Sequence, residues 1–508
     1  MSGADEVSVG GPSLSAAAVD TLARRAATAV LAPEARPRLE RSYAFLREAA
    51  RRGTAVYGLT TGCGPLAGNA ISTAARAEFQ RNLLRSHACT IGRPHPTELV
   101  RAAMIVRAHV FARGCSGVDP ALVDLLLGML NRGVHPIVRE IGGVGASGDL
   151  VELAQIGLTA IGEGDVEYGG DRLPAAAGLE AAGLAPIVPR FREGLALMNG
   201  TSFHVGAAAV LLARARRTAA AAEVAAALAL EALCGHGEAF SAALHQARPH
   251  AGQIAVAARI RRLVEGSALL RSNEPAAAQQ DAYTLRCIPQ ILGVVIDGIE
   301  AAARVVQVEI DSAIDNPLFL ADEGQVLHGG NFHGQPVSAA LDHLKVAIVE
   351  LGVASERRLA RLLDPALNAG LPPFLVRGAA GLHSGFMGLQ YCAGAMAADN
   401  AVLAAPASVR SVSTNASNQD VVSMGMVAAR QAARVIENAE QMVAIELLCG
   451  AQALDLRGVE RSGSGTRAAH ALIRRHAAVL ADDRPLASDV DAVLSLVTSG
   501  AFVEGNQP

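Results

Sequence analysis

Apolar and polar residues alternate with the period of an α-helix along most of the chain, and this pattern predicts helices as the main elements. Two helices are predicted within residues 13–52, with Ser13-Leu14-Ser15 opening the first. Pro33 and Pro37 mark a break before the second helix. Further helical patterns cover residues 78–87, 98–132 (one or two amphipathic helices), 150–161, 202–235 and most of 425–508. The chain is therefore predicted to be mainly α.

The segments between the predicted helices are concentrated in the first part of the chain. Residues 56–66 and 142–149 are rich in glycine and are predicted to be loops, and residues 162–173 are typical of a short turn-and-strand insert. From Ser202 onward the chain changes to long Ala/Leu helices, which are typical of a central bundle. We therefore expect a loop-rich N-terminal part, residues 1–201, and a helical part, residues 202–508, within one continuous structural unit.

Composition and charge exclude several classes of function. Hydrophobic residues make up 51% of the chain and aromatic residues 3%, which suits closely packed helices. The net charge is −4 and no basic cluster combines with aromatic residues, so nucleic-acid binding is not expected. Seven scattered cysteines form no Cys-x-x-Cys pair, so neither a zinc site nor a disulfide framework is predicted.

The chain shows no sign of a membrane segment or a targeting signal. Residues 1–12 lack the basic start and apolar run of a signal peptide. The most apolar helical region, Val205 to Cys234, is too charged to span a bilayer. Its charged residues are Arg214, Arg216, Arg217, Glu223 and Glu231. A cytoplasmic protein without membrane partners is expected.

The stretch from Gly142 to Leu150 is a candidate for backbone chemistry. If the amide nitrogen of Gly148 attacks the carbonyl carbon of Ala146, a five-membered ring closes. Loss of water, including the Ser147 hydroxyl, then leaves an imidazolone with an exocyclic methylene. Glycine at 148 allows the close approach of its nitrogen, because it carries no side chain. Ala-Ser-Gly is also a common turn or helix N-cap, so the tripeptide alone leaves both interpretations open.

The surrounding motif carries a resemblance to a known family. Gly-Ala-Ser-Gly-Asp-Leu, followed by a helical apolar run, resembles the signature of the aromatic amino-acid ammonia-lyases and aminomutases. Motif blocks in the family's order cover roughly residues 55–500, and they are closest to bacterial tyrosine ammonia-lyase and tyrosine aminomutase. The resemblance implies a long-helix bundle of the fumarase/aspartase-like type and a methylideneimidazolone (MIO) made from Ala146, Ser147 and Gly148. It also implies a homotetramer whose active sites are shared between subunits, and no external cofactor.

The resemblance further assigns roles to individual residues. Tyr57, in Tyr-Gly-x-x-Thr-Gly-x-Gly, is the base that removes a β-proton, and Asn199 and Tyr283 stabilise the MIO electrophile. The substrate-binding residues implied are His87, Gln280, Arg286, Asn331, Phe332 and Gln419. An unperturbed tyrosine has a pKa near ~10, so nearby positive potential is expected to lower the pKa of Tyr57.

Three of these residues are spaced as neighbours on a helix would be. Gln280, Tyr283 and Arg286 recur at i, i+3 and i+6, so on a helix they are expected to share a face. Arginine suits a substrate carboxylate because its planar fork forms two parallel charge-assisted hydrogen bonds.

The choice of substrate depends on two positions. His87 indicates a polar ring, because an imidazole can hydrogen-bond a phenol or another imidazole. Gln419 stands where histidine lyases usually carry Glu, so tyrosine, giving p-coumarate, is the favoured substrate. Histidine ammonia-lyase (giving urocanate), tyrosine 2,3-aminomutase and an inactive scaffold homologue remain as alternatives. Pro65 favours the lyase over the aminomutase, because some aminomutases carry Glu there.

Some positions depart from the family's usual pattern. Val151-Glu152 follows Asp-Leu where relatives often have Ala-Pro or Thr-Pro, which places an additional carboxylate near the expected electrophile. Cys63 lies inside the loop that carries Tyr57, residues 56–66, which we call the base loop. Asp311 stands where Asn is commoner in the family. These departures leave room for an unusual substrate.

Overall fold

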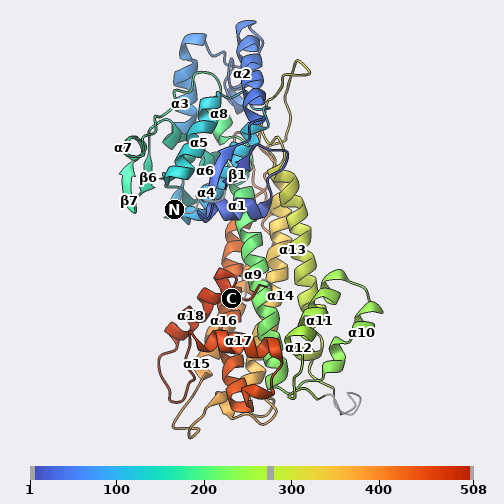
Figure 1. Ribbon diagram of the computed structural model, residues 1–508. Helices are drawn as coiled ribbons and strands as arrows, with labels where there is room; N and C mark the ends of the chain where they lie inside the picture. The colour runs from blue at the N-terminus through green and yellow to red at the C-terminus, as the bar shows by residue number, and fades with distance from the viewer. Residues whose placement is uncertain (1–5, 272–279, 504–508) are drawn as a thin grey trace. The chain divides into compact units, whose positions relative to one another are not determined.

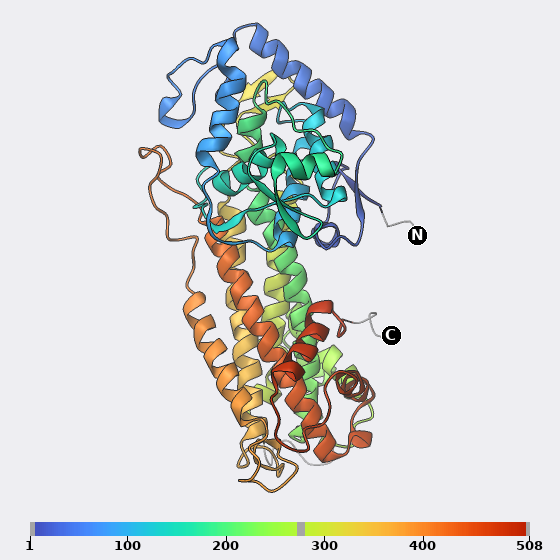
Figure 2. The ribbon, with the colours of Figure 1, turned by 90° about the vertical axis from the view of Figure 1, so that its left-hand side faces the viewer.

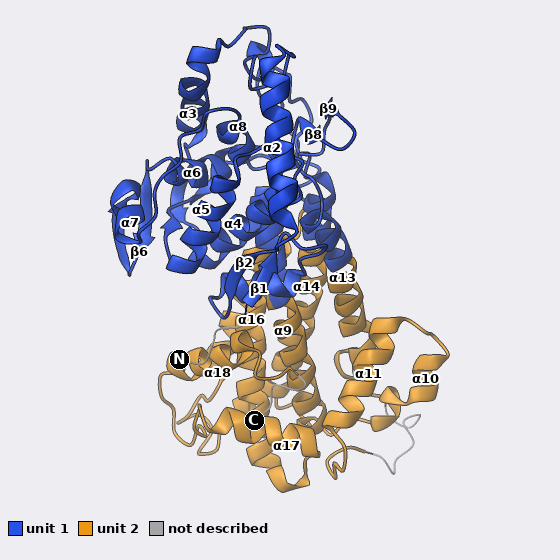
Figure 3. Ribbon diagram, turned by 45° about the horizontal axis from the view of Figure 1, so that its top comes forward, with its two compact units in different colours: residues 1–213, 302–342, 406–430 blue, residues 214–301, 343–405, 431–508 orange. Residues whose placement is uncertain are grey.

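A computed structural model describes residues 6–271 and 280–503, which divide into two compact units (Figure 3). Unit 1 consists of residues 1–213, 302–342 and 406–430, and unit 2 of residues 214–301, 343–405 and 431–508. Both units are built from interleaved segments, whereas the expected parts, 1–201 and 202–508, are contiguous. Four long helices contribute residues to both units: α9 (Ser202–Ala232), α13 (Ile288–Ile310), α14 (Gln335–Leu363) and α16 (Gly425–Arg457).

Unit 1 contains most of the short elements (Figure 1). Its α-helices are α1 (Ala16–Ala23), α2 (Ala35–Arg51), α3 (Arg76–His87), α4 (Thr97–Ala112), α5 (Pro120–Arg132), α6 (Leu150–Ala160), α7 (Ala175–Ala181) and α8 (Glu193–Met198). Its strands are β1 (Glu6–Val9), β2 (Thr28–Leu31), β3 (Ile91–Pro94), β4 (His135–Pro136), β5 (Arg139–Ile141), β6 (Asp165–Tyr168), β7 (Asp171–Pro174), β8 (Leu318–Leu320) and β9 (Gln325–Leu327). Short 3₁₀ turns lie at Gly64–Leu66 and Thr73–Ala75.

The core of unit 1 is centred on α4. Every residue of this helix from Leu99 to Ala112 is buried, so the amphipathic helix expected in this region is in fact enclosed on all sides. α1 and α5 both pack against it. Arg107 and His109 are polar residues of α4 that are fully buried. Because polar residues usually face solvent, they made the sequence of this helix look amphipathic.

The small sheets of unit 1 connect distant parts of the sequence. β1 pairs in parallel with β2, a pairing that the sequence analysis did not predict. The turn-and-strand insert expected at 162–173 is confirmed: β6 and β7 form a hairpin, and β4 adds a third strand. The helix expected to open near Ser13 begins at Ala16, because Ser15 is its N-cap and accepts a hydrogen bond from the Ala18 amide.

Unit 2 is a bundle of long helices, in which the unit 2 parts of α14 and α16 run side by side (Figure 2). Buried or half-buried ion pairs join these helices: Arg358–Glu446 links α14 to α16 at 2.5 Å, and Arg214–Glu440 links α9 to α16 at 2.7 Å. The other helices of unit 2 are α10 (Ala242–Gln246), α11 (Ala251–Leu263), α12 (Tyr283–Arg286), α15 (Met387–Leu403), α17 (Ser464–Arg474) and α18 (Ala487–Ser499), with 3₁₀ turns at Gly237–Phe240, Pro373–Leu375 and Val459–Arg461. The mainly α architecture is thus as predicted. Across the described residues, each helix is too short or too polar to cross a membrane.

Candidate active site

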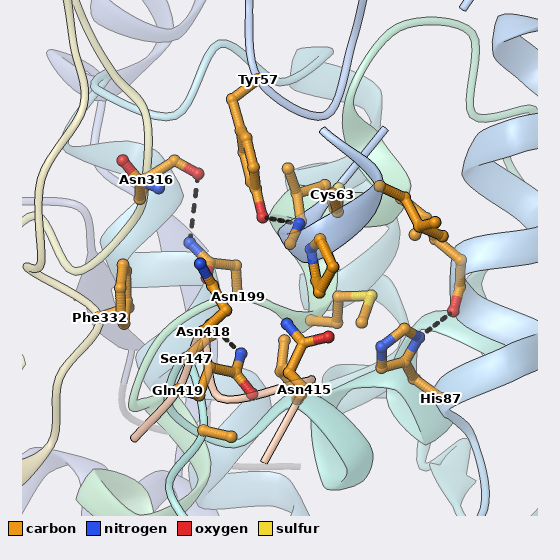
Figure 4. Close-up of a pocket in the computed structure, with 18 of the residues that line it drawn as sticks. Tyr57, Cys63, His87, Ser147, Asn199, Asn316, Phe332, Asn415, Asn418 and Gln419 are labelled. Atoms are coloured by element: carbon orange, nitrogen blue, oxygen red, sulfur yellow. Dashed lines mark hydrogen bonds between the residues drawn. The ribbon is translucent and has the colours of Figure 1, made fainter. Parts of the chain in front are cut away.

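One cavity of about 980 Å³ in unit 1 gathers most of the residues that the sequence singled out (Figure 4). Its walls come from the base loop, the end of α3, the Ala-Ser-Gly loop, the end of α8 and the loops before α14 and α16. The predicted site residues among its lining are Tyr57, His87, Ala146, Ser147, Asn199, Phe332 and Gln419.

The Ala-Ser-Gly loop folds back on itself. Ser147 and Gly148 have left-handed backbone angles, φ 50° and 82°, and Gly145 bridges to Gly148. A Cβ added at Gly148 would lie 2.0 Å from the carbonyl oxygen of Gly200, so only glycine fits there. The Gly200 amide donates to the Ser147 carbonyl at 3.0 Å, which holds the turn in place. This tight turn fits a tripeptide whose ends must meet to close a ring.

Asp149 fastens the same loop to the start of α9. Its amide donates to the Gly200 carbonyl at 2.8 Å, and its carboxylate accepts from the amides of Phe203 and His204. The His204 ring lies 2.7 Å from the other carboxylate oxygen, and both side chains are fully buried. Burial opposes a charged His204, but the Asp149 carboxylate outweighs this effect and raises the His204 pKa.

Glu152, the carboxylate that departs from the family pattern, braces the loop from the other side. Its Oε1 accepts a hydrogen bond from the Gly143 amide at 2.6 Å, and the side chain is completely buried. Burial, together with the nearby Asp149 carboxylate, raises the pKa of Glu152 to about 7. The residue therefore contacts the glycine-rich segment rather than the cavity.

Tyr57 is half-buried, and its hydroxyl oxygen accepts a hydrogen bond from the Gly64 amide at 2.6 Å. The hydroxyl itself donates to the Cys63 sulfur, an interaction that favours the protonated tyrosine. Burial raises the pKa of Tyr57, and the Gly64 amide opposes this effect only in part. The sequence-based expectation of a lowered Tyr57 pKa is therefore wrong for the single chain, because the effect of burial is larger than that of the Gly64 amide donor. Burial also raises the pKa of Cys63, to about 11.

Asn199 is held by a buried ionic network. Its Nδ2 donates to Asp315 Oδ1 at 2.8 Å, and Asp315 pairs with Arg192 at 2.9 Å. Burial disfavours the charged form of Asp315, yet Arg192, Arg107 and the Asn199 amide together hold its pKa below the usual range. Asp315 was not singled out in the sequence, because its partners lie more than a hundred residues away.

His87 and Gln419 face the cavity with defined hydrogen-bonding roles. The Nδ1–H of His87 donates to the Leu83 carbonyl at 2.9 Å, so the Nε2 of a neutral ring is an acceptor. Gln419 donates through Nε2 to the Ser147 hydroxyl at 3.1 Å, and its Oε1 accepts from Thr414 at 3.0 Å. Figure 4 shows Gln419 beside Ser147, with His87 on the other side of Asn415.

Two predicted site residues lie near the cavity without lining it. Gly148 is covered by Gly200, as described above. Asn331 is exposed, and its Nδ2 donates to the Ala313 carbonyl at 3.3 Å. Its neighbour Phe332 does line the cavity.

Gln280, Tyr283 and Arg286 belong to unit 2, whereas the cavity belongs to unit 1. The prediction that Gln280 shares a helical face with Tyr283 and Arg286 is wrong, because α12 begins only at Tyr283. The three side chains nevertheless lie together: Arg286 donates to Gln280 Oε1, and its guanidinium lies 4.8 Å from the Tyr283 ring centre. Gln279 lies outside the described residues. Gln280 and Arg286 line a separate cavity of about 490 Å³.

Several lining residues were missed in the sequence. The polar ones are Asn69, Ser86, Asn316, His333, Asn415, Asn418 and Asp420. The signal for the last three of these was available, since the block from Ser413 to Ser423 is dense in amide and hydroxyl side chains. Only Gln419 was selected from it, because the resemblance assigned a role to that position alone.

Comparison with known proteins places this site in a family. The model of the family described as aromatic amino acid lyase matches residues 14–475. A histidine ammonia-lyase of Gloeobacter violaceus is 46% identical over 490 residues, covering 96% of this chain and 95% of that protein. A histidine ammonia-lyase of Symbiobacterium thermophilum is 44% identical, covering 96% and 95%. The crystal structure of a tyrosine aminomutase from Streptomyces globisporus has a TM-score of 0.94 at 38% identity and covers 98% of each chain.

These likenesses extend over almost the whole chain, so the protein is a carbon–nitrogen lyase. The chain belongs to the aromatic amino acid lyase family.

Proposed function

We propose that this enzyme eliminates ammonia from an aromatic L-amino acid, with histidine as its leading substrate, by means of an MIO formed from Ala146, Ser147 and Gly148. The observation that carries the proposal is the gathering of Tyr57, Ser147 and Asn199 in one cavity, together with the ring-binding candidates His87 and Gln419. The back-folded tripeptide with an obligatory glycine supports MIO formation.

Histidine is favoured by the relatives, and the His87 ring is compatible with it. Two relatives, at 46% and 44% identity, are named histidine ammonia-lyases. The tyrosine preference expected from Gln419 is not supported by these relatives, which fit the histidine alternative better. The acceptor Nε2 of His87 suits the N–H of an imidazole substrate.

Tyrosine is the second candidate, and Gln419 is the observation that favours it. Its uncharged amide offers no carboxylate to an imidazolium, and it lies directly beside Ser147. The structural neighbour at 38% identity is named a tyrosine aminomutase, so return of the amine to the β-carbon is a further outcome to measure.

The chain's own residues supply the remaining steps. When formed, the MIO supplies an electrophilic carbon for the substrate's amine. Tyr57 removes the β-proton, as its hydroxyl oxygen faces the cavity and is fixed by the Gly64 amide. Asn199, held by Asp315, is fixed beside the tripeptide as a hydrogen-bond donor.

The substrate carboxylate is assigned to Arg286 and Asn331, and the first of these lies in unit 2. We assign a homotetramer in which Gln280, Tyr283 and Arg286 of neighbouring copies complete each site, as the family resemblance implies. An arginine brought close to Tyr57 would oppose the effect of burial and lower the pKa of the base.

Product analysis tests the proposal. Purified protein is offered histidine, tyrosine or phenylalanine separately, with ultraviolet absorbance for the unsaturated acid and chromatography for β-amino acids. Urocanate as the main product supports the proposal, and p-coumarate as the main product replaces histidine with tyrosine. Ser147→Ala is the control, and normal turnover by this variant would overturn the mechanism.

A further inference from the structure

A second, strongly polar cavity of about 230 Å³ lies in unit 1, lined by residues of α4, of the end of α5 and of the segment after α1. Helix α4 packs against both α1 and α5 (Figure 1). Three of its lining residues are arginines: Arg25 follows α1, Arg101 lies in α4 and Arg132 ends α5. Among the lining residues in the described part of the chain there is no Asp or Glu. The cavity therefore carries a concentrated positive charge.

Arg101 is the buried member of this group, with 4% of its surface exposed. Its guanidinium donates to three backbone carbonyls, those of Leu22, Ala23 and Leu130, at 2.8–3.0 Å. These acceptors are neutral, so they orient the guanidinium without balancing its charge. Burial, and then the neighbouring Arg25, lower the pKa of Arg101 to about 10, so it remains charged at neutral pH.

His135 separates Arg25 from Arg101 without supplying enough acceptors for both. Arg25 Nη2 lies 3.0 Å from Nδ1 of the ring, and Arg101 Nη1 lies 2.9 Å from Nε2. Burial and the two arginines lower the pKa of His135 to about 3, so the ring is neutral at pH 7. Arg25 Nη2 also lies 3.3 Å from Nε2, so both arginines compete for the one acceptor nitrogen that a neutral imidazole offers. Acceptor oxygens of a bound ligand would relieve this competition.

The backbone holds Arg25 in this position at some cost. Arg25 adopts a left-handed conformation, φ 61°, directly after the C-cap of α1, where glycine is the usual residue. Asn131, another lining residue, exchanges two hydrogen bonds with the backbone of Ala29. These contacts hold the walls of the cavity in place.

We propose that this cavity is a binding site for a small tetrahedral oxyanion, either inorganic phosphate or the phosphate group of a monoester. Charged acceptor oxygens would satisfy the donors of Arg25 and Arg101 together, since guanidinium groups bind such oxygens through paired hydrogen bonds. The ligand would also balance the buried charge of Arg101 and tie α1 to α4 and α5. The site is separate from the proposed active-site cavity, with which it shares no lining residue.

Calorimetric titration of the full chain with inorganic phosphate, at constant ionic strength adjusted with sodium chloride, tests this site. Arg25→Gln removes an exposed arginine that contacts His135, and phosphate binding by this variant should weaken by about tenfold or more because a charge-assisted contact is lost. Arg24→Gln is the matched control. Arg24 is the adjacent residue, it pairs with Asp20 at 3.4 Å and it does not line the cavity, so binding should be unchanged.

Each result has a defined meaning, and none requires catalytic activity. Phosphate binding that is lost in Arg25→Gln and kept in Arg24→Gln supports the site. A parallel titration with glycerol phosphate distinguishes the sources: tighter binding than phosphate indicates a monoester, and weaker binding indicates the free ion. No saturable binding of either compound, or equal binding by the two variants, overturns the proposal. Failure here would leave the proposed lyase activity untouched.

Discussion

The side-chain amide of Gln419 donates a hydrogen bond to the hydroxyl of Ser147 at 3.1 Å. Ser147 is the residue whose hydroxyl must leave if the tripeptide forms an MIO, and Gln419 is also the position that the family resemblance connects with the substrate ring. One residue is thus placed to act twice: first on the leaving hydroxyl, and later on the substrate.

Gln419→Glu should separate these two actions. The new carboxylate can pair with an imidazolium, so kcat/KM for histidine should rise about tenfold relative to tyrosine. An ionised carboxylate cannot donate to the Ser147 hydroxyl, so formation of the MIO absorbance should be slower. Asn415→Asp is the matched control, because it adds the same charge to another residue that lines the cavity. Equal changes in kcat/KM for both substrates would show that residue 419 does not distinguish between the two substrate rings.

Gly148→Ala should abolish the MIO absorbance and the activity together. The new Cβ would lie 2.0 Å from the Gly200 carbonyl oxygen, at a residue with φ 82°, so the tight turn cannot form. Gly68→Ala serves as the control, because nothing lies within 4 Å of a Cβ at that position. Intact-mass measurement reports the loss of two waters from the mature chain. A Gly148→Ala protein that still shows this loss would exclude the proposed ring closure.

The local motifs selected residues that the fold brings into one cavity, whereas the interactions that hold these residues in place were not visible in the sequence. Tyr57, Ser147 and Gln419 were each selected from short blocks, and all three line one cavity. The bond from Asn199 to Asp315 spans 116 positions, and no local pattern indicates such a pairing. The direction of the Tyr57 pKa shift was also wrong, because the extent of burial depends on the tertiary fold.

The helices were predictable because their signal is also local. Periodicity located α3 and α6 to within two residues, as each helix is defined by its own sequence. The parallel pairing of β1 with β2 joins segments that each have only four residues, and such short runs carry little periodic signal. Complete burial of α4 depends on what packs around it, so its sequence alone suggested a helix with one polar side.

Asp315→Asn should destabilise unit 1 by about 3–5 kcal/mol, because it leaves the buried Arg192 without its counter-charge. Both side chains of this pair are fully buried, and Asp315 also orients Asn199. The midpoint of urea unfolding measures the loss. Asp322→Asn is the control, since its pair with Arg41 is exposed on both sides and its removal should leave the midpoint unchanged. Similar midpoints for the two variants would contradict a structural role for the Asp315 network.

Glu152 should give the protein a stability that falls as the pH rises. Its pKa is raised from 4.5 to about 7 in the folded state, so its protonated form is favoured by folding. The stability is fully present below pH 4.5, is lost as the pH rises to 7 and is constant above that value. The total change for this one group is at most about 3 kcal/mol.

Glu152→Gln keeps an acceptor for the Gly143 amide but cannot ionise, so it should flatten this slope and raise stability at pH 8. Urea unfolding at a series of pH values provides the measurement. Glu163→Gln is the control: Arg85 lowers the pKa of Glu163, so this group titrates below the same window. An unchanged slope in Glu152→Gln would assign the pH dependence to other groups.

Mixed assemblies test whether active sites are shared between copies. Tyr57 lies in unit 1 and Arg286 in unit 2, and the proposed homotetramer takes them from different chains for each site. Tyr57→Phe and Arg286→Ala should each be inactive alone. Co-expression of the two variants with different affinity tags should restore about a quarter of the wild-type activity, because random assembly pairs an intact Tyr57 with an intact Arg286 in a quarter of the sites. A tagged double variant, Tyr57→Phe with Arg286→Ala, co-expressed with wild type controls for simple dilution. If the mixed single variants stay inactive while they co-purify, both residues must come from the same chain, and the assignment of shared sites fails.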